Sequence, residues 1–491
     1  MFRPAAPAIC GTIRRGLPLV VVLNRRDFLK AGALPGVGLA GAPRRPNVLF
    51  IVSDQLHHAT PAKTPALDRL ASEGVRFTHA LCATPFCSPT RASFMTGVYP
   101  HAHRIVNNGT QLDPRLPTTE QALFEAGYTC RQFGKWHLGD RGLIPAYKDQ
   151  PASGYRDGED TPRRKRGEKV GRNGLPVVMA EAVGRANRQY DGSGAPNTVI
   201  GRIDLAPEKM IESRIADEAI QEIGRLAGKP FFVTVSLPAP HAPWEIGEPY
   251  YSLHPRARIA LPANRHSIHS ADRQTAAFRF GQLLGEDGMR EYLGVYYGLV
   301  SMVDWNVGRL LETLRRHSLE RDTLVVFTAD HGDMQGGHGC YDKTTFSMYE
   351  ETTRVPLIVR FPGRIRAGKQ AATPAGSCDI SPTILDYLGV KPRFTPHGVS
   401  LRPYLEGRED LQRSIFCERE RGERNFQRLI RTLEWKYSYA STGASQLYHI
   451  AKDPGETNNL IDQPSARAVQ ADLHARLARW MRETGDPRKL P

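Results

Sequence analysis

The strongest constraint on the fold is a series of short apolar segments separated by longer segments with helical periodicity. Each apolar segment has the length of a strand and is almost wholly hydrophobic, which is typical of strands buried on both faces of a sheet. These segments are 47–53, 128–133, 231–237, 323–329 and 355–361, and the predicted helices among them are 64–74, 118–126, 211–226 and 290–316. The alternation predicts an α/β domain with a mostly parallel central sheet flanked by helices.

Size and composition predict a large domain and a smaller one. The chain has 491 residues, of which 40% are hydrophobic and 24% charged, as in globular proteins. No apolar run reaches the roughly 20 residues that a membrane helix needs. Towards the C-terminus, segments 415–418, 428–439 and 446–450 are typical of short antiparallel strands, and 464–484 of a helix packed on them. We therefore predict an α/β domain at 46–395 and a smaller α+β subdomain at 396–491.

The first 45 residues differ from the rest in charge. They carry eight Arg or Lys and one Asp, a net +7 out of the +15 of the whole chain. The segment Asn24-Arg25-Arg26-Asp27-Phe28-Leu29-Lys30, followed by small residues from 31 to 42, resembles a twin-arginine export signal. We expect residues 1–45 to be an export leader that engages the Tat machinery and directs the protein to the periplasm or outside the cell. Because 24 residues precede Arg25, we expect the natural start codon downstream of Met1.

Charge and cysteine content narrow the function classes. The remaining positive charge suits a cleft for an anionic substrate, and no basic stripe interleaved with aromatic residues supports nucleic-acid binding. The seven cysteines are Cys10, Cys82, Cys87, Cys130, Cys340, Cys378 and Cys417. Setting aside one in the leader and one at the reactive position described below leaves an odd number. That excludes a complete disulfide framework but leaves one or two bridges open. The sequence contains no Cys-x-x-Cys pair of the kind that would indicate a zinc site.

Polar residues follow three of the predicted strands at the point where each strand ends. Asp54 and Gln55 follow the first strand, His241 follows 231–237, and Asp330-His331 follows 323–329. Open α/β sheets place their sites at the carboxyl ends of the strands, so we expect these side chains to meet. Two carboxylates, an amide oxygen and an imidazole suit a divalent cation. For any single Asp, a helix cap or a surface ion pair is the plainer interpretation.

The side chain of Cys87, in the segment Cys87-Ser88-Pro89-Thr90-Arg91, is a candidate reactive group. Pro89 favours a helix start and Gly97 a helix stop, so Cys87 is predicted to lie at a helix N-terminus. Free backbone N–H groups and the positive end of the helix dipole meet at such a position, and Arg91 lies one turn later on the same face. A reactive side chain there would face an anion. A small buried cysteine without function is the alternative.

This Cys-x-Pro-x-Arg pattern, followed by Ala-Ser-Phe-x-Thr-Gly, resembles the sulfatase family, and the resemblance extends from about Asn47 to the segment 453–460. It implies an alkaline-phosphatase-like fold and the hydrolysis of an organic or glycan sulfate ester. It also implies that a formylglycine-generating enzyme oxidises Cys87 to formylglycine, whose hydrated aldehyde is the nucleophile. In the same family, matching motifs place a metal at Asp54, Gln55, Cys87, Asp330 and His331.

The chain departs from many members of the family in having Gln55 where they have a second Asp, which lowers the charge of the metal site. Oxygen-rich ligation suggests Ca²⁺, and the imidazole leaves Mn²⁺ or Zn²⁺ open. Four basic residues have counterparts in the family, in the expected order: Lys135 and His137 in a Gly-Lys-x-His motif, His241 in a Pro-His-x-Pro loop, and the later Lys343. Other histidines match no motif and are expected to be structural or to lie at the substrate rim, namely His57, His58, His101, His103 and His338.

The resemblance implies a role for each residue. The metal and Arg91 hold the formylglycine diol, Lys135 and Lys343 offset charge on the sulfuryl oxygens, and His241, with or without Lys343, protonates the leaving alcohol. His137 then takes a proton from the second hydroxyl, so that sulfate is expelled.

Two other functions fit parts of the pattern. A phosphonate monoester or phosphodiester hydrolase of the same superfamily shares the Cys-x-Pro-x-Arg motif and the Asp-Gln and Asp-His metal pairs. An inactive binder of sulfated glycans is the alternative from another class, and the pairing of Cys87 with Arg91 speaks against it. Activity panels of sulfate and phosphonate esters separate the two enzymes, and the chemical state of Cys87 separates enzyme from binder.

Overall fold

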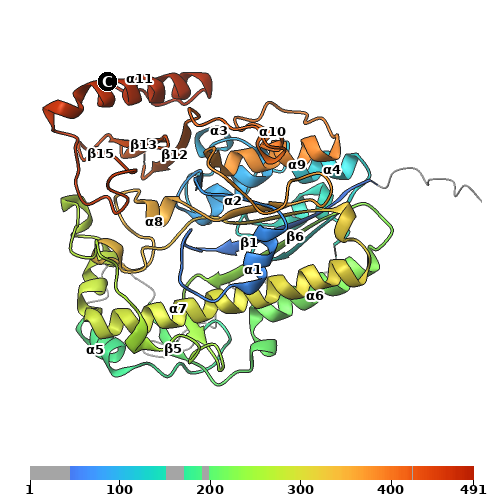
Figure 1. The fold of residues 1–491 in the computed structure, drawn as a ribbon, viewed down its shortest axis with the longest axis horizontal. Coiled ribbons are helices and arrows are strands. Elements are labelled where there is room, and N and C mark those ends of the chain that lie inside the picture. Colours follow the sequence, from blue (N-terminus) through green and yellow to red (C-terminus); the bar gives the residue numbers. More distant parts are fainter. Residues whose placement is uncertain (1–44, 151–170, 191–197, 423) are drawn as a thin grey trace, which may run out of the picture. The chain divides into compact units, whose positions relative to one another are not determined.

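The computed structural model describes residues 45–150, 171–190, 198–422 and 424–491 (Figure 1). Its main sheet has the strand order β10-β2-β9-β8-β1-β6-β4, in which β8, β1, β6 and β4 are mutually parallel and β9 is antiparallel to both of its neighbours. The strands are β1 (Asn47–Asp54), β2 (Val75–Phe77), β4 (Thr129–Gly134), β6 (Phe231–Pro240), β8 (Thr323–Ala329), β9 (Leu357–Arg360) and β10 (Lys369–Ala371). The predicted, mostly parallel central sheet is confirmed.

Helices cover both faces of this sheet. On one face lie α1 (Pro65–Ser72), α6 (Ile211–Arg225) and α7 (Ala276–Arg316), and on the other lie α2 (Cys87–Thr96), α4 (Thr119–Glu125) and α9 (Ile380–Leu388) (Figure 1). Both faces of the central strands are therefore shielded from water, and all eight residues of β1 are buried. The continuous apolar composition of these strands follows from this position.

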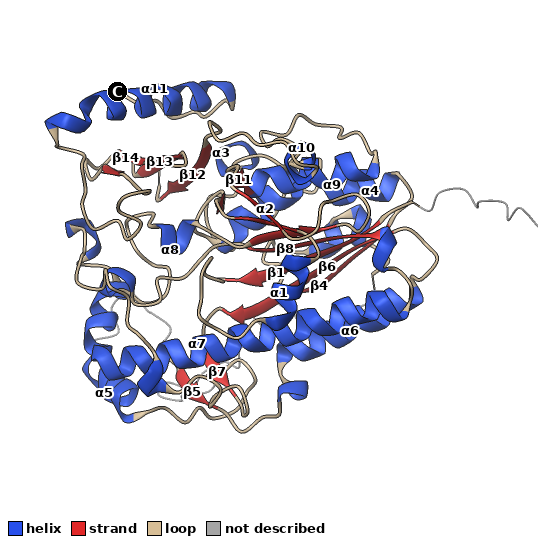
Figure 2. Ribbon diagram, viewed as in Figure 1, coloured by secondary structure: helices blue, strands red, loops and turns tan. Residues whose placement is uncertain are grey.

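A second sheet lies in the C-terminal part of the chain (Figure 2). Its antiparallel strands are β12 (Ile415–Glu420), β13 (Phe426–Arg431), β14 (Lys436–Ala440) and β15 (Gln446–Tyr448), and α11 (Arg467–Glu483) packs on β13 and β14. Leu473, Leu477 and Trp480 form the buried face of that helix. The predicted α+β character of this region is confirmed. The boundary at 395 stays a prediction.

Shorter elements connect these layers. They are α3 (Pro100–His103), α5 (Glu181–Gln189), α8 (Glu350–Thr353) and α10 (Arg402–Leu405), together with the small parallel pairs β3 (Ala80–Leu81) with β11 (Ala375–Gly376) and β5 (Ile200–Arg202) with β7 (Trp244–Ile246).

Two predicted elements were wrong in extent. Helix α7 begins at Ala276 rather than at 290, with the side chain of Thr275 accepting a hydrogen bond from Phe278 N. Gly285 interrupts the helix with φ 62° and ψ −169°, and this break hides the helical periodicity of the first turns. The segment 428–439 is not one strand but the hairpin of β13 and β14, because Thr432 and Trp435 close a turn between them.

Residues 1–44 of the predicted leader 1–45 lie outside the described residues. Within the described part of the chain, no helix is both long enough and apolar enough to cross a membrane. The six cysteines in that part are all buried free thiols, so neither of the bridges left open by the sequence forms among them.

Candidate active site

Three adjacent strands bring their terminal polar residues to one edge of the sheet. Strand β1 pairs with β8 on one side and β6 on the other; it ends at Asp54, while Asp330 directly follows β8 and His241 directly follows β6. Gln55 N donates to Asp330 Oδ1 at 3.0 Å, with the chain turning at Gln55 through a positive φ of 66°. The predicted meeting of these residues is confirmed.

Cys87 is the first residue of α2, as its sequence context predicts. Phe86, in an extended conformation, caps the helix, and Gly97 ends it in the left-handed conformation at φ 67°. Ser88 N donates a hydrogen bond to Asn108 Oδ1 at 3.0 Å, which satisfies one of the free N–H groups of the first turn. The Cys87 side chain is completely buried.

Arg91 joins the two carboxylates. Its Nε donates to Asp330 Oδ2 at 3.0 Å, and its Nη2 lies 3.4 Å from Asp54 Oδ2. Nη1 donates to Ser236 Oγ at 2.6 Å and to the Lys135 carbonyl at 2.9 Å. Ser236 lies within β6, a mostly apolar segment in which no sequence motif marks it. Arg91 is therefore held in place by four groups and fixes the spacing between Asp54 and Asp330.

The Cys87 sulfur lies among basic groups. Its Sγ is 3.2 Å from His331 Nε2, 3.3 Å from Lys343 Nζ and 3.7 Å from Asp54 Oδ1. His137 and His241 also act on its charge. Burial raises the pKa of the thiol, but the nearby cations, Lys135 and Lys343 foremost, outweigh burial and hold that pKa well below its usual range. The site thus stabilises a negative charge at the position of this side chain.

Lys135 forms an ion pair with Asp54. Burial raises the pKa of Asp54, as does Cys87, yet Lys135, His241 and Arg91 together lower it below its usual range. Burial in turn lowers the pKa of Lys135, but Asp54 and Cys87 raise it above its usual value. The carboxylate and the ammonium are therefore both charged, although each is buried.

The residues present fit a divalent cation. Asp54, Cys87, Asp330 and His331 each offer a ligand atom, and these atoms all lie within 4.8 Å of one another. His331 directs Nδ1 to the Gly332 carbonyl at 2.9 Å, which leaves the lone pair of Nε2 for the cluster.

Gln55 completes the donor set. Its Nε2 donates to Asp333 Oδ2 at 2.6 Å and to Asp342 Oδ1 at 2.8 Å, whereas its Oε1 is buried with no hydrogen-bond partner among the described residues. A buried amide oxygen without a partner is costly, and a cation would satisfy it. Asp333 is itself held by the Tyr292 hydroxyl at 2.5 Å. Asp333, Asp342 and Tyr292 therefore orient Gln55, and no sequence motif marks these three residues for that role.

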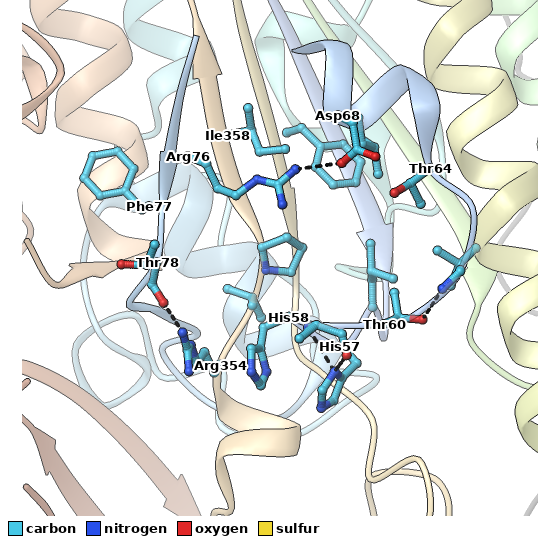
Figure 3. A pocket seen from close by; sticks show the side chains of 18 of the residues that line it. His57, His58, Thr60, Thr64, Asp68, Arg76, Phe77, Thr78, Arg354 and Ile358 are labelled. Carbon is cyan, nitrogen blue, oxygen red and sulfur yellow. Dashed lines mark hydrogen bonds and ion pairs between the residues drawn. The ribbon is translucent and has the colours of Figure 1, made fainter. Parts of the chain in front are cut away.

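The other histidines lie apart from this cluster. His57 and His58 line a pocket of about 640 Å³ between the loop after β1 and strands β2 and β9, together with Arg76 and Arg354 (Figure 3). No predicted catalytic residue lines it.

The remaining three serve as structural residues. His101 hydrogen-bonds to Glu418, His103 to Ser93, and His338 stacks on Tyr349 with a centroid distance of 3.7 Å.

Comparisons with known proteins agree with this geometry. The sulfatase family model matches residues 46–390, and a model described as N-sulphoglucosamine sulphohydrolase, C-terminal, matches 336–483. A choline-sulfatase of Rhizobium meliloti is 30% identical over 473 residues, covering 90% of this chain and 88% of the relative. An ulvan-active sulfatase of Formosa agariphila is 28% identical over 512 residues, covering 99% and 90%.

A solved structure gives the same fold. The phosphonate monoester hydrolase from Silicibacter pomeroyi superposes with a TM-score of 0.72 at 25% identity, covering 90% of this chain and 96% of that one. The family model spans most of the described chain and includes every residue of the cluster around Cys87. The chain belongs to the sulfatase family of the alkaline-phosphatase-like superfamily and is a sulfuric ester hydrolase.

Proposed function

We propose that the protein hydrolyses an organic or glycan sulfate ester to the free alcohol and inorganic sulfate. The reaction uses formylglycine made from Cys87 and a divalent cation, for which Ca²⁺ is the favoured candidate. The observation that carries this proposal is the position of Cys87. Its sulfur lies within 3.7 Å of Lys343, of His331 and of Asp54, a candidate metal ligand. A nucleophile, a cation and charge-neutralising groups are what the transfer of a sulfuryl group requires.

Two groups would supply chemistry that the unmodified side chains lack. Formylglycine would offer a hydrated aldehyde, with one hydroxyl to attack sulfur and a second whose deprotonation releases the sulfate. A divalent cation held by Asp54, Gln55, Asp330 and His331 would lower the pKa of a hydroxyl and offset negative charge. The positive surroundings that lower the pKa of the Cys87 thiol would favour an ionised oxygen at the same position.

The lysines act on the sulfuryl oxygens. Lys343 Nζ lies 3.3 Å from the Cys87 sulfur, and Lys135 pairs with Asp54, whose Oδ1 lies 3.7 Å from the same sulfur. Because these groups are buried, their charges act in a region of low dielectric and are worth more than in water.

Two histidines transfer protons in the proposed reaction. His241 places Nδ1 on the Ala242 carbonyl at 2.7 Å, so Nε2 is the ring atom left for the reacting groups. Burial and the two lysines lower the pKa of His241, and an imidazolium of lowered pKa gives up its proton readily to a leaving alcohol. His137, which acts on the charge of Cys87, accepts the proton whose loss expels sulfate.

A phosphonate monoester hydrolase is the second candidate. It is favoured by the Asp54-Gln55 pair in the sequence and by the TM-score of 0.72 to the Silicibacter pomeroyi enzyme. A panel of sulfate esters, including choline sulfate and sulfated sugars, should be assayed beside a panel of phosphonate monoesters. Higher kcat/KM for the sulfate esters supports the sulfatase. Higher kcat/KM for the phosphonates reverses the assignment.

We also propose that residues 1–45 direct export through the Tat machinery and that a formylglycine-generating enzyme modifies the chain. The leader's Arg25-Arg26 pair supports the first proposal, and the Cys87-to-Arg91 motif supports the second. Replacing both leader arginines by lysine should abolish export of the protein to the periplasm. Co-expression of a formylglycine-generating enzyme should raise specific activity, and no change on co-expression in a host lacking such an enzyme would contradict the second proposal.

A further inference from the structure

One wall beside Cys87 is built by the C-terminal sheet. Phe86 directly precedes Cys87, and Thr344 and Phe346 follow Lys343; all three side chains are partly exposed and border the buried cluster. We call these three residues the rim. Strand β12 runs beside them, since Arg419 Nη1 donates to the Phe346 carbonyl at 3.0 Å. Residues far apart in the sequence therefore meet next to the nucleophile position.

The alternation of β12 separates its charges onto two faces. Glu418 and Glu420 point away from the rim: Glu418 accepts from His101, and Glu420 pairs with Arg428 at 2.8 Å. Arg419 and Arg421 point to the rim. Side chains in a strand alternate between faces, so the acidic residues of β12 cannot neutralise Arg419, nor Arg421, which directly follows the strand.

Arg419 is the buried member of the pair. Its guanidinium lies 4.8 Å from the centre of the Phe86 ring, and it is 4% exposed. Its Nε and Nη2 have no hydrogen-bond partner among the described residues. Burial, and after it Arg421, lowers the pKa of Arg419 to about 9. A buried cation without a counter-ion is costly to keep, which calls for an anion that is absent from the folded chain itself.

Arg421 is the exposed member. Its Nη2 lies 3.4 Å from the Thr345 carbonyl, two residues after Lys343. Asp272 is the carboxylate whose charge acts on Arg421. Its two oxygens already accept hydrogen bonds from Phe346 N, from Ser347 and from the Tyr349 hydroxyl. No ion pair of either arginine with a carboxylate occurs within the described ranges.

We propose that Arg421, with the charge of Arg419 behind it, receives a second anionic group, a carboxylate or another sulfate, on the alcohol part of the substrate. This inference rests on the proposed sulfatase function and narrows its substrate class to esters with two negative charges. Guanidinium groups bind carboxylate and sulfate through paired hydrogen bonds. The same pair repels a cationic alcohol such as choline, so it selects against that class as well.

Matched substrates test the charge preference. A hexuronic acid 2-sulfate is compared with its methyl ester, which removes the carboxylate charge, and N-sulfoglucosamine 6-sulfate is compared with N-acetylglucosamine 6-sulfate, which removes a sulfate. The two pairs distinguish a carboxylate from a sulfate as the second anion. We expect the doubly charged member of at least one pair to show about tenfold higher kcat/KM, mainly through a lower KM, and choline sulfate to be the poorest substrate.

Variants locate the effect. Arg421→Gln should reduce the preference within the favoured pair by about tenfold, and Arg421→Lys should keep part of it. Arg424→Gln removes one positive charge from an exposed position of the adjacent hairpin and should leave the preference unchanged. The test does not need Arg419→Gln, because the exposed Arg421 can be replaced without disturbing the fold.

The outcomes separate the two proposals. If the wild type hydrolyses sulfate esters but treats both members of each pair alike, this inference fails while the sulfatase function stands. A preference that Arg421→Gln and Arg424→Gln reduce equally also overturns it, because general charge then explains the effect. If no sulfate ester is hydrolysed, the proposed function fails and this inference falls with it.

Discussion

Among the described residues, two clusters of carboxylates and histidine resemble metal sites, and they differ in whether their polar atoms have partners. The cluster at Cys87 combines Asp54, Asp330 and His331, and the other combines His101, Glu418 and Asp486. In the second, His101 donates from N and Nδ1 to the two oxygens of Glu418, and Arg428 Nε lies 2.5 Å from Asp486. Every polar atom there has a partner.

In the cluster at Cys87, by contrast, not every polar atom has a partner. Gln55 Oε1 has no partner among the described residues, and the thiol attracts three positively charged groups. Ligand types gathered in space therefore do not identify a metal site by themselves. An unpartnered buried oxygen beside the cluster is the second observation that favours a cation at Cys87, because a cation would satisfy that oxygen. We call the second cluster the junction cluster, since it joins α3, β12 and the segment after α11.

The largest expected effect separates the two clusters by activity. Cys87→Ala should lower kcat by at least about 10⁴-fold, because no other side chain can form the proposed diol. The fold should persist, since a cysteine contributes little packing. His101→Ala, in the junction cluster, should retain turnover while lowering stability. Measuring kcat and the melting temperature of both variants checks this contrast, and turnover by Cys87→Ala within a few-fold of wild type refutes the nucleophile.

The next effect separates them by metal content. Asp54→Asn or Asp330→Asn removes one of two carboxylates and should weaken divalent-cation affinity by about 100-fold or more. Glu418→Gln should leave metal content unchanged. Elemental analysis should find one ion for each chain in the wild type and in Glu418→Gln. Full activity after exhaustive chelation, with no metal detected, contradicts the site, and a second ion lost in Glu418→Gln contradicts the comparison.

A smaller effect divides roles inside the active-site cluster. His241→Ala should slow esters with poor leaving groups by about 10²-fold or more, yet slow activated aryl sulfates far less, since these depart without a proton. Lys135→Ala should slow both classes by similar factors, because the sulfuryl oxygens carry charge whatever the leaving group. A leaving-group series in both variants checks this. Equal, flat losses would remove His241 as the general acid.

The smallest effect concerns the stability of the junction cluster. Burial lowers the pKa of His101, but Glu418 and Asp486 raise it above 6.5 overall. A folded-state pKa above the unfolded value adds stability that is complete below pH 6.5 and is lost as pH rises through the folded pKa. His101→Gln should therefore cost more stability at pH 6 than at pH 9. Denaturant unfolding at both pH values checks the sign, and a larger cost at pH 9 contradicts it.

Much of the fold follows from local sequence. Strand β8 was predicted at its observed bounds, Thr323–Ala329, because a strand buried on both faces leaves a continuous apolar run. The start of α2 at Cys87 followed from Pro89 and Gly97. The first turns of α7 did not, since Gly281, Gly285 and Gly288 lie where a helix favours other residues.

The site was predictable where a motif or a strand end marked it. Asp54, His241 and Asp330 come directly at strand ends, and their meeting follows from parallel pairing. Ser236 and Tyr292 were not predictable, because a polar atom within a buried strand or helix shows its purpose only when its partner is placed beside it. Arg419 and Arg421 belong to the same class: the sequence does not show that β12 reaches the rim.

The chemical state of Cys87 tests the central claim most directly. The purified, active protein should be digested and the peptide containing Cys87 examined by mass spectrometry, with Cys82 and Cys130 as internal controls that are likewise buried. The account predicts an aldehyde or its hydrate at Cys87, in proportion to specific activity, and unmodified thiols at both controls. A fully active preparation with an intact thiol at Cys87 would contradict it.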